Sequence, residues 1–269
     1  MQTQDLRVSL GEGMTVEARR IQYPRSNGPT LVFLHESLGN IDLWRRFPQR
    51  LSEATGFDAL IYNRLGYGDS SDEPLPRPYD YQEREGAVVL PRLLDALDLD
   101  EVILIGHSDG GSIALIAAGV LGDRVKGLIT MAAHTYADYL TTEGIQAMKV
   151  RYEETNLREK LQRYHGSRTD DLFSAWHTVW LDEDFNASMD FSHWLARIQC
   201  PSMIIQGDAD EYGVPEQVTD IVAGIGPSAR ALFMPGTGHS PHLEQPEPLV
   251  EFVCDFLLSD SSVKNQVLC

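Results

Sequence analysis

The stretch Gly106-His107-Ser108-Asp109-Gly110-Gly111 decides how this 269-residue chain folds. The run 101–105 (EVILI) comes directly before it, and its aliphatic side chains are typical of a buried strand. The run 112–120 (SIALIAAGV) follows the glycines and has the apolar face of a helix. The sequence therefore predicts a strand, a sharp turn with Ser108 at its apex, and a helix.

A turn of this kind suits a nucleophilic serine, because the strained apical residue lifts its hydroxyl above the sheet. A side chain at Gly106 or Gly110 would crowd the turn, which accounts for both glycines. The turn also directs backbone N–H groups and the positive end of the following helix toward the place where an oxyanion would form. The alternative, a surface serine on an ordinary strand-to-helix turn, is weaker in this context.

The composition is that of a globular protein with an acidic surface. Apolar residues make up 42% of the chain, and its length fits one α/β domain with an insertion. The net charge of −18 argues against nucleic acid and anionic membranes as partners, because phosphate binding needs clustered Lys or Arg. No N-terminal stretch resembles a signal peptide and no apolar run is long enough to span a membrane, so we expect a cytoplasmic protein.

The three cysteines have neither metal-ligand spacing nor a C-x-x-C pattern. We expect Cys200 and Cys254 to be inert core thiols and Cys269, the last residue, to be a thiol of the tail. We expect no metal ion, and catalysis by a serine nucleophile needs no organic cofactor.

Strand-like and helix-like segments alternate along most of the chain. Further strands are predicted at 6–10, 14–18, 30–34, 57–62, 126–132, 201–206 and 229–234, and helices at 41–54, 81–97 and 246–258. This alternation favours an α/β fold with a mostly parallel sheet that is covered on both faces. Ligands of such sheets bind beyond the carboxyl ends of the strands, which is where His35, Ser108 and His134 fall.

The alternation stops between residues 137 and 198, where the sequence is helix-like, charged and aromatic. We interpret this segment as a helical cap inserted into a core made of residues 1–136 and 199–269. Trp176 and Trp180 lie one helical turn apart in the predicted cap, and either line an acyl pocket or pack the cap onto the core.

A serine hydroxyl needs a base to take its proton and an acid to orient that base. The loop Gly207–Gly213 (GDADEYG) follows one predicted strand, and the loop Pro235–His242 (PGTGHSPH) follows the next. Both loops fall at the same sheet edge as Ser108. Triads of this kind occur in unrelated folds with different orders along the sequence, and the order Ser, Asp, His is typical of one of these folds.

With these loops the chain resembles the α/β-hydrolase superfamily, and within it a bacterial esterase- and lactonase-like subgroup. The resemblance covers nearly the whole chain and is carried by His35, the segments 64–70 (RLGYGDS) and 238–246 (GHSPHLEQP), the serine turn and the loop before Asp210. It implies an α/β-hydrolase fold with a helical cap and a triad in which Ser108 is the nucleophile, Asp210 the acid and His239 the base. It also implies an oxyanion hole formed by the backbone N–H of Asp109 and that of Ser37, with Leu38 as the alternative second donor.

One position departs from the family pattern, because Glu36 follows His35 where the family usually has glycine. A carboxylate there opposes an oxyanion, so Glu36 must point away, pair with a cation, or take part in the chemistry. We therefore place Glu36 and Leu38 among the candidate substrate-binding residues, with Trp176 and Trp180.

Several other polar residues admit two interpretations. Asp208 is the alternative to Asp210 as the acid. His134 either binds polar groups of the substrate or is a hydrogen-bonded histidine beside the site. We expect His107 to pack beneath the nucleophile, and His242 to be structural or to line the rim. Arg64 is expected to stabilise its own turn.

The expected activity is hydrolysis of a small, uncharged or weakly polar carboxylic ester through an acyl-enzyme on Ser108. Alternatives on the same triad are a lactonase, a C–C bond hydrolase or a thioesterase. A different class is a small-molecule sensor that turns its ligand over slowly. The expected partner is the small-molecule ester, with no nucleic acid and no membrane, and the chain is either a monomer or a homodimer.

Overall fold

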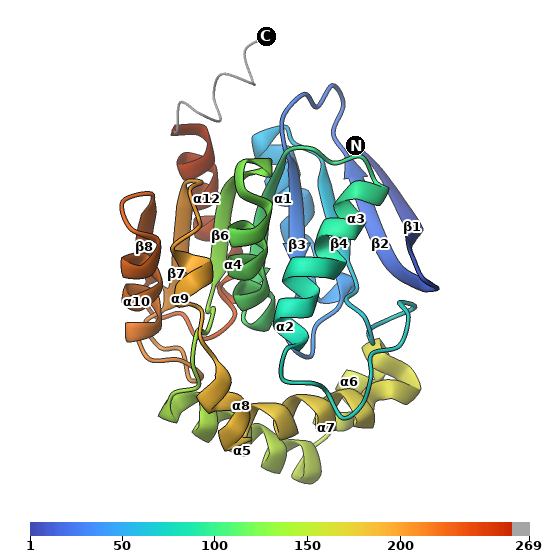
Figure 1. The fold of residues 1–269 in the computed structure, drawn as a ribbon, viewed down its shortest axis with the longest axis vertical. Coiled ribbons are helices and arrows are strands. Elements are labelled where there is room, and N and C mark those ends of the chain that lie inside the picture. Colours follow the sequence, from blue (N-terminus) through green and yellow to red (C-terminus); the bar gives the residue numbers. More distant parts are fainter. Residues whose placement is uncertain (260–269) are drawn as a thin grey trace.

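The structure, a computed structural model, describes residues 1–259, so the expectation about Cys269 lies outside the described residues. Its eight-stranded sheet has the order β1-β2-β4-β3-β5-β6-β7-β8 (Figure 1). The strands are β1 (Gln2–Gly11), β2 (Met14–Gln22), β3 (Thr30–Leu34), β4 (Ala59–Tyr62), β5 (Val102–His107), β6 (Val125–Met131), β7 (Ser202–Gly207) and β8 (Ala229–Met234).

The sheet is mostly parallel, as predicted. β1 and β2 form an antiparallel hairpin, and β2 also pairs antiparallel with β4, whereas the pairs from β4 through β8 are parallel. Each predicted strand is present. β1 and β2 are longer than predicted, because their pairing extends to Gln2 and Gln22 through backbone hydrogen bonds that any side chain permits.

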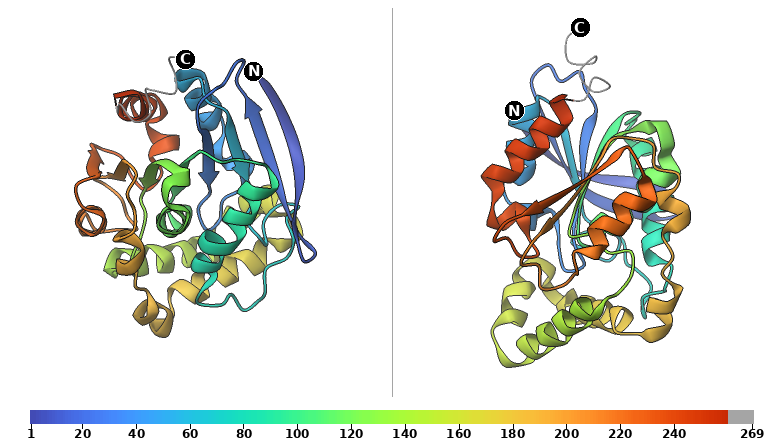
Figure 2. Two further views of the ribbon diagram at one scale, coloured as in Figure 1. Left: turned by 45° about the horizontal axis from the view of Figure 1, so that its top comes forward. Right: turned by 90° about the vertical axis from the view of Figure 1, so that its left-hand side faces the viewer.

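Helices cover both faces of the sheet (Figure 2). They include α1 (Phe47–Thr55), α4 (Asp109–Leu121), α10 (Glu216–Ile225) and α12 (Pro246–Ser259), and the short helix α11 (Pro241–Glu244) precedes α12. Alternate residues of β5 point to opposite faces. Ile103 and Ile105 pack with α1 and α12, whereas Val102 and Leu104 pack with α4 and α10. The sheet is therefore apolar on both faces, which explains its continuous hydrophobic strands.

Two predicted helices are interrupted. The segment predicted at 41–54 divides into a 3₁₀ turn (Ile41–Trp44) and α1, because Arg45 adopts a positive φ of 51°. The segment predicted at 81–97 consists of α2 (Tyr81–Arg84), a π-helical turn (Glu85–Val89) and α3 (Leu90–Ala96). Pro91 has no N–H to donate to the preceding turn, and the wider π turn accommodates it.

Five helices lie between β6 and β7. They are α5 (Tyr139–Glu154), α6 (Leu157–His165), α7 (Thr169–Trp180), α8 (Glu183–Ser188) and α9 (Ser192–Leu195). α5 to α8 form a layer across one end of the sheet (Figures 1 and 2). An apolar cluster inside this layer includes Ile145, Phe173, Trp176 and Phe185.

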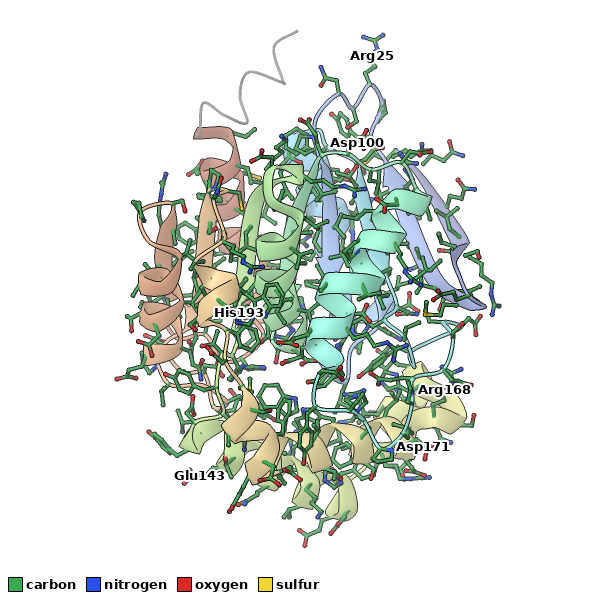
Figure 3. All side chains as sticks on the ribbon, in the orientation of Figure 1. Arg25, Asp100, Glu143, Arg168, Asp171 and His193 are labelled. Carbon is green, nitrogen blue, oxygen red and sulfur yellow. The ribbon has the colours of Figure 1, made fainter. Side chains whose placement is uncertain are left out.

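Charged side chains at the periphery, such as Arg25, Asp100 and Glu143, are exposed and point away from the sheet and its helices (Figure 3). Within residues 1–259, no helix combines the length and the apolar character needed to cross a membrane.

Candidate active site

Ser108 stands alone between β5 and α4, in a conformation that few residues other than glycine adopt. Its φ is 52° and its ψ is −121°, at a cost of about 1–3 kcal/mol for such a backbone. A β-carbon at Gly110 would overlap the carbonyl oxygen of Leu34, and one at Gly106 would overlap the carbonyl oxygen of Gly110. The close approach of α4 to β3 therefore requires glycine at position 110, and the close approach of α4 to β5 requires glycine at position 106.

The structure brings Ser108, His239 and Asp210 into one hydrogen-bonded chain. The Nε2 atom of His239 lies 3.0 Å from the Oγ atom of Ser108. On the other side of the ring, Nδ1 lies 2.9 Å from Oδ1 of Asp210. The same carboxylate oxygen accepts the backbone N–H of Tyr212 at 2.9 Å, which holds it in place. This is the geometry of a nucleophile, a base and a residue that orients the base.

The charges around Ser108, His239 and Asp210 suit proton transfer from Ser108 to His239. Burial alone would lower the pKa of His239, but the carboxylate of Asp210 raises it above the ordinary value, with further contributions from Glu211 and Glu36. Burial would raise the pKa of Asp210, and its interaction with His239 lowers it instead. Asp210 is therefore an acceptor for the imidazole N–H across the neutral pH range.

The alternative acid, Asp208, is exposed and does not belong to the hydrogen-bonded series Asp210–His239–Ser108. Its Oδ1 atom accepts the backbone N–H of Gly236 at 2.6 Å, which fastens the loop that precedes His239. The structure thus pairs Asp210, and not Asp208, with the histidine.

A cavity of about 230 Å³ opens beside Ser108, between the sheet edge and the layer of helices α5 to α7. Every candidate substrate-binding residue lines it: Glu36, Leu38, His134, Trp176 and Trp180. Its other lining residues are Ser37, His107, Ser108, Thr141, Ile145, Met148, Glu211, Tyr212, His239 and Ser240. Within the described part of the chain, the lining holds two carboxylates and neither lysine nor arginine.

The two tryptophans satisfy both interpretations offered by the sequence. Each lines the cavity, and each also belongs to the apolar cluster of the helical layer. Trp180 is further fixed by a hydrogen bond of 3.0 Å from its Nε1 to the hydroxyl of Tyr81. One wall of the cavity is therefore a rigid aromatic surface.

The spare histidines differ in what they contact. His134 lines the cavity, and its Nε2 donates to the backbone carbonyl of Tyr212 at 2.9 Å, so the ring is both a wall residue and a hydrogen-bonded one. His242 is buried against Trp44, with ring centroids 4.7 Å apart, and is absent from the cavity lining. His242 is thus structural.

Among residues 1–259, Glu36 pairs with a histidine and not with Lys or Arg. Its Oε2 atom lies 3.4 Å from Nδ1 of His107, and a quarter of its side chain is exposed to the cavity side. Burial would raise the pKa of Glu36, but His107 and His242 lower it well below the ordinary value. Glu36 is a carboxylate held beside the candidate oxyanion hole.

Sequence reasoning gave Arg64 a narrower role than the structure shows, and it gave Tyr212 no role. Arg64 does not merely stabilise its own turn, because its guanidinium forms a buried ion pair of 2.7 Å with Asp109. Tyr212 covers the candidate base, with ring centroids 4.6 Å apart from His239. The motif 64–70 marked the segment of Arg64, but no spacing in the sequence links position 64 to position 109.

The described residues contain no group of three or more His, Cys, Asp or Glu side chains placed to hold a metal ion. The partly buried thiols of Cys200 and Cys254 each have a pKa raised to about 11, chiefly by burial, which leaves them protonated and unreactive at neutral pH.

A sharp serine turn, a neighbouring histidine and acid, and a mostly parallel sheet define a hydrolase of the α/β class. The family model for the alpha/beta hydrolase fold matches residues 29–190, and the chain belongs to this family.

Relatives with known names are hydrolases of several kinds. The chain is 30% identical to the serine hydrolase BPHL of Homo sapiens over 209 residues, which covers 75% of this chain and 69% of that protein. It is 27% identical to a pimeloyl-[acyl-carrier protein] methyl ester esterase of Edwardsiella ictaluri, covering 84% and 92%. It is 29% identical to a 2-hydroxy-6-oxononadienedioate/2-hydroxy-6-oxononatrienedioate hydrolase of Cupriavidus pinatubonensis, covering 85% and 86%.

Solved structures share the fold. The enol-lactonase from Burkholderia xenovorans LB400 superposes with a TM-score of 0.70 at 19% identity, covering 94% of this chain and all of that one. A hydrolase from Pseudomonas aeruginosa PA01 has a TM-score of 0.72 at 20% identity, covering 94% and 98%. At these identities the structural likeness concerns the fold alone.

Proposed function

We propose that this protein is a serine hydrolase that cleaves a small carboxylic ester through an acyl-enzyme on Ser108. The observation that carries the proposal is the hydrogen-bonded chain from Asp210 through His239 to Ser108, at the wall of a cavity. Relatives that include a serine hydrolase and a methyl ester esterase support the same class of activity.

In the first half of the reaction, the Oγ atom of Ser108 attacks the ester carbonyl while Nε2 of His239 takes its proton. The carbonyl oxygen becomes an oxyanion, held by the backbone N–H groups of Ser37 and Asp109. Collapse of this intermediate breaks the bond to the alcohol oxygen, which leaves with the proton from His239. The acyl group remains on Ser108.

In the second half, a water molecule gives a proton to His239 and attacks the acyl carbonyl. The second intermediate collapses to a carboxylic acid and a free Ser108, which recovers its proton from His239. Asp210 stays ionised throughout and holds the imidazole with Nε2 facing the serine.

The cavity supports a small, uncharged substrate. Its volume of about 230 Å³ suits a small molecule, and the carboxylates of Glu36 and Glu211 disfavour an anionic acyl group near the serine. We propose that the helical segment 137–198 acts as a cap, since Ile145, Met148 and Trp176 supply the apolar wall opposite the sheet edge.

The test is turnover of a series of p-nitrophenyl esters with short to medium acyl chains by the native protein and by Ser108→Ala. Ser174→Ala, which changes an exposed serine of α7, is the matched control. We expect sustained hydrolysis by the native protein and the control, and none above background by Ser108→Ala. Undiminished hydrolysis by Ser108→Ala would refute the proposal. A single burst without turnover by the native protein would favour a small-molecule sensor.

A further inference from the structure

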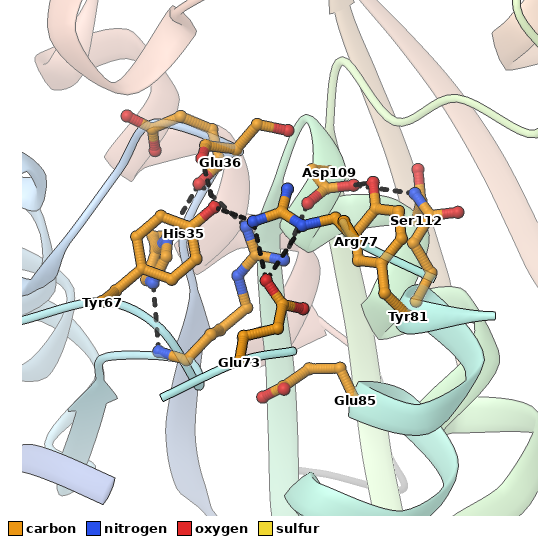
Figure 4. Close-up of polar contacts among 12 residues, drawn as sticks. His35, Glu36, Tyr67, Glu73, Arg77, Tyr81, Glu85, Asp109 and Ser112 are labelled. Atoms are coloured by element: carbon orange, nitrogen blue, oxygen red, sulfur yellow. Dashed lines mark hydrogen bonds and ion pairs between the residues drawn. The ribbon is translucent and has the colours of Figure 1, made fainter. Parts of the chain in front are cut away.

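A buried side chain joins the two backbone segments that form the candidate oxyanion hole. Arg64 lies just after β4, and 3% of its side chain is exposed. Its Nη1 atom donates to Oδ2 of Asp109 at 2.7 Å, and its Nη2 atom donates to the backbone carbonyl of Glu36 at 3.1 Å. Figure 4 labels these two partners, Asp109 and Glu36. One planar guanidinium therefore holds both the start of α4 and the loop after β3.

The carbonyl of Glu36 is held from a second direction as well. Nδ1 of His35 donates to it at 2.7 Å, and Nε2 of the same ring accepts the backbone N–H of Arg64 at 3.2 Å. Burial and the charge of Arg64 lower the pKa of His35 to about 3, so the ring is neutral with its proton on Nδ1. The side chain of Arg64 thus holds the carbonyl of Glu36 directly, and its backbone N–H holds the same carbonyl through the ring of His35.

The orientation of this carbonyl determines where the next N–H points. In a trans peptide, the C=O of one residue and the N–H of the following residue point in opposite directions. The Glu36–Ser37 bond is trans, because the cis bond of the described chain is Leu75–Pro76. The carbonyl is held by Arg64 and His35 and also accepts the backbone N–H of Gly39 at 3.0 Å. The peptide therefore directs the N–H of Ser37 away from these donors, and Ser37 lines the cavity.

The partner at the other end of Arg64 is equally constrained. Oδ1 of Asp109 accepts the hydroxyl of Tyr81 at 2.6 Å and Nε2 of Gln82 at 2.8 Å, and the carboxylate is fully buried. Asp109 is the first residue of α4, so these bonds also hold the backbone N–H that follows Ser108. Arg64 links this cluster directly to the carbonyl of Glu36, and Tyr67 and Arg77 form a second route from Tyr81 to the carbonyl of Ser37.

We propose that Arg64 is a positioning residue that sets the spacing between the backbone N–H groups of Ser37 and Asp109. The inference rests on the proposed function, because it assigns both N–H groups to one oxyanion. An arginine suits this task because its fork offers two N–H groups in one plane, whereas a lysine offers one point charge. The Nε atom of Arg64 is buried and has no partner within residues 1–259.

The test compares Arg64→Lys with Arg124→Lys. Lysine at position 64 keeps the charge beside Asp109 but loses the fork. Arg124 provides the matched control, because it also joins a carboxylate and a backbone carbonyl, those of Asp95 and Leu99, on a turn beyond the far end of α4. For each variant, kcat and KM for a p-nitrophenyl ester are measured together with the affinity for a trifluoromethyl ketone, which forms a tetrahedral oxyanion on a serine nucleophile.

We expect Arg64→Lys to lower kcat by about 100-fold, the effect of a misplaced oxyanion donor, with KM within about twofold. The affinity for the ketone should fall in parallel with kcat, because both depend on the oxyanion. Arg124→Lys should leave all three quantities unchanged. A folded Arg64→Lys protein with native kcat would overturn the inference, as would equal losses in both variants.

A second variant covers the case in which Arg64→Lys does not fold. Asp109→Asn keeps the backbone N–H at position 109 and removes the charge that holds Arg64, so the same loss of kcat with little change in KM is expected. Native kcat in this variant would also overturn the inference. If the native protein neither hydrolyses esters nor binds the ketone, the proposed function fails and the inference fails with it.

Discussion

His107, the residue before the candidate nucleophile, donates a hydrogen bond of 2.8 Å from its Nε2 atom to the backbone carbonyl of His239. A carbonyl oxygen only accepts, so the proton on Nε2 is assigned by its partner. The opposite ring atom, Nδ1, faces Glu36 at 3.4 Å. One imidazole therefore contacts the serine turn, the loop of the candidate base and the loop of the candidate oxyanion hole.

The pH dependence of the reaction follows from the environment of His239. The base acts only when neutral, and Asp210 raises its pKa above the ordinary value of 6.5 in spite of burial. We therefore expect kcat/KM to be at its maximum at alkaline pH and to decline with a midpoint above pH 6.5. Below that midpoint it should fall by about tenfold for each unit by which the pH is lowered. A rate that stays flat from pH 8 to pH 5 would exclude His239 as the base.

Glu36→Gln is expected to move that midpoint to lower pH. The carboxylate of Glu36 is among the charges that raise the pKa of His239, and glutamine removes the charge while keeping the shape. The groups facing His107 and Glu36 also include His35 and His242, which the substitution leaves in place. Profiles of kcat/KM against pH measure the shift, with Glu143→Gln on the exposed side of α5 as the control. An unchanged midpoint in Glu36→Gln would show that Glu36 does not act on the base.

Asp210→Asn is expected to lower kcat by about 10⁴-fold, because an amide no longer holds the imidazole with its proton on Nδ1. The neighbouring carboxylate offers a matched comparison. Asp208→Asn alters a bond to the N–H of Gly236 and makes no contact with the imidazole, so we expect kcat within about threefold of native. Steady-state kinetics of both variants on one ester give the two values of kcat. A larger loss of kcat in Asp208→Asn than in Asp210→Asn would assign the role of the acid to Asp208.

Gly110→Ala should destabilise the fold by about 3 kcal/mol or more, because the new β-carbon overlaps the carbonyl of Leu34 in the buried contact between β3 and α4. Gly127→Ala in β6 places its β-carbon at an ordinary contact distance, 3.4 Å from a side-chain carbon of Leu257. Urea unfolding followed by circular dichroism measures both. Similar unfolding midpoints for the two variants would contradict the close approach beneath Ser108.

Local sequence patterns were sufficient to predict the sheet and the serine turn. Strands such as β3 and β5 are short apolar runs bounded by polar or glycine residues, and the glycines around Ser108 have one steric explanation. The loops of Asp210 and His239 could be placed at the edge of Ser108, because each follows a strand and parallel strands end at the same edge. The choice of Asp210 over Asp208 rested on the resemblance to the family.

The supporting contacts could not be predicted, since they join side chains far apart in the chain. Arg64 meets Asp109 across 45 positions, and His107 meets His239 across 132. Such pairs depend on how β4, β5 and β8 are ordered in the sheet and on the rotamers that packing leaves open. His107 could not be predicted as the partner of Glu36 for the same reason, although the position of Glu36 directly after His35 was recognised in the sequence as unusual.

The most direct test of the central claim is to identify the acylated residue during turnover. Native protein is mixed with p-nitrophenyl acetate, quenched in acid within the first turnover, digested and mapped by mass spectrometry. The account predicts one acetyl group on the peptide that contains Ser108, present in the native protein and absent in Ser108→Ala. Continued release of p-nitrophenol with no acetyl group on that peptide, or with the acetyl group on another residue, would contradict it.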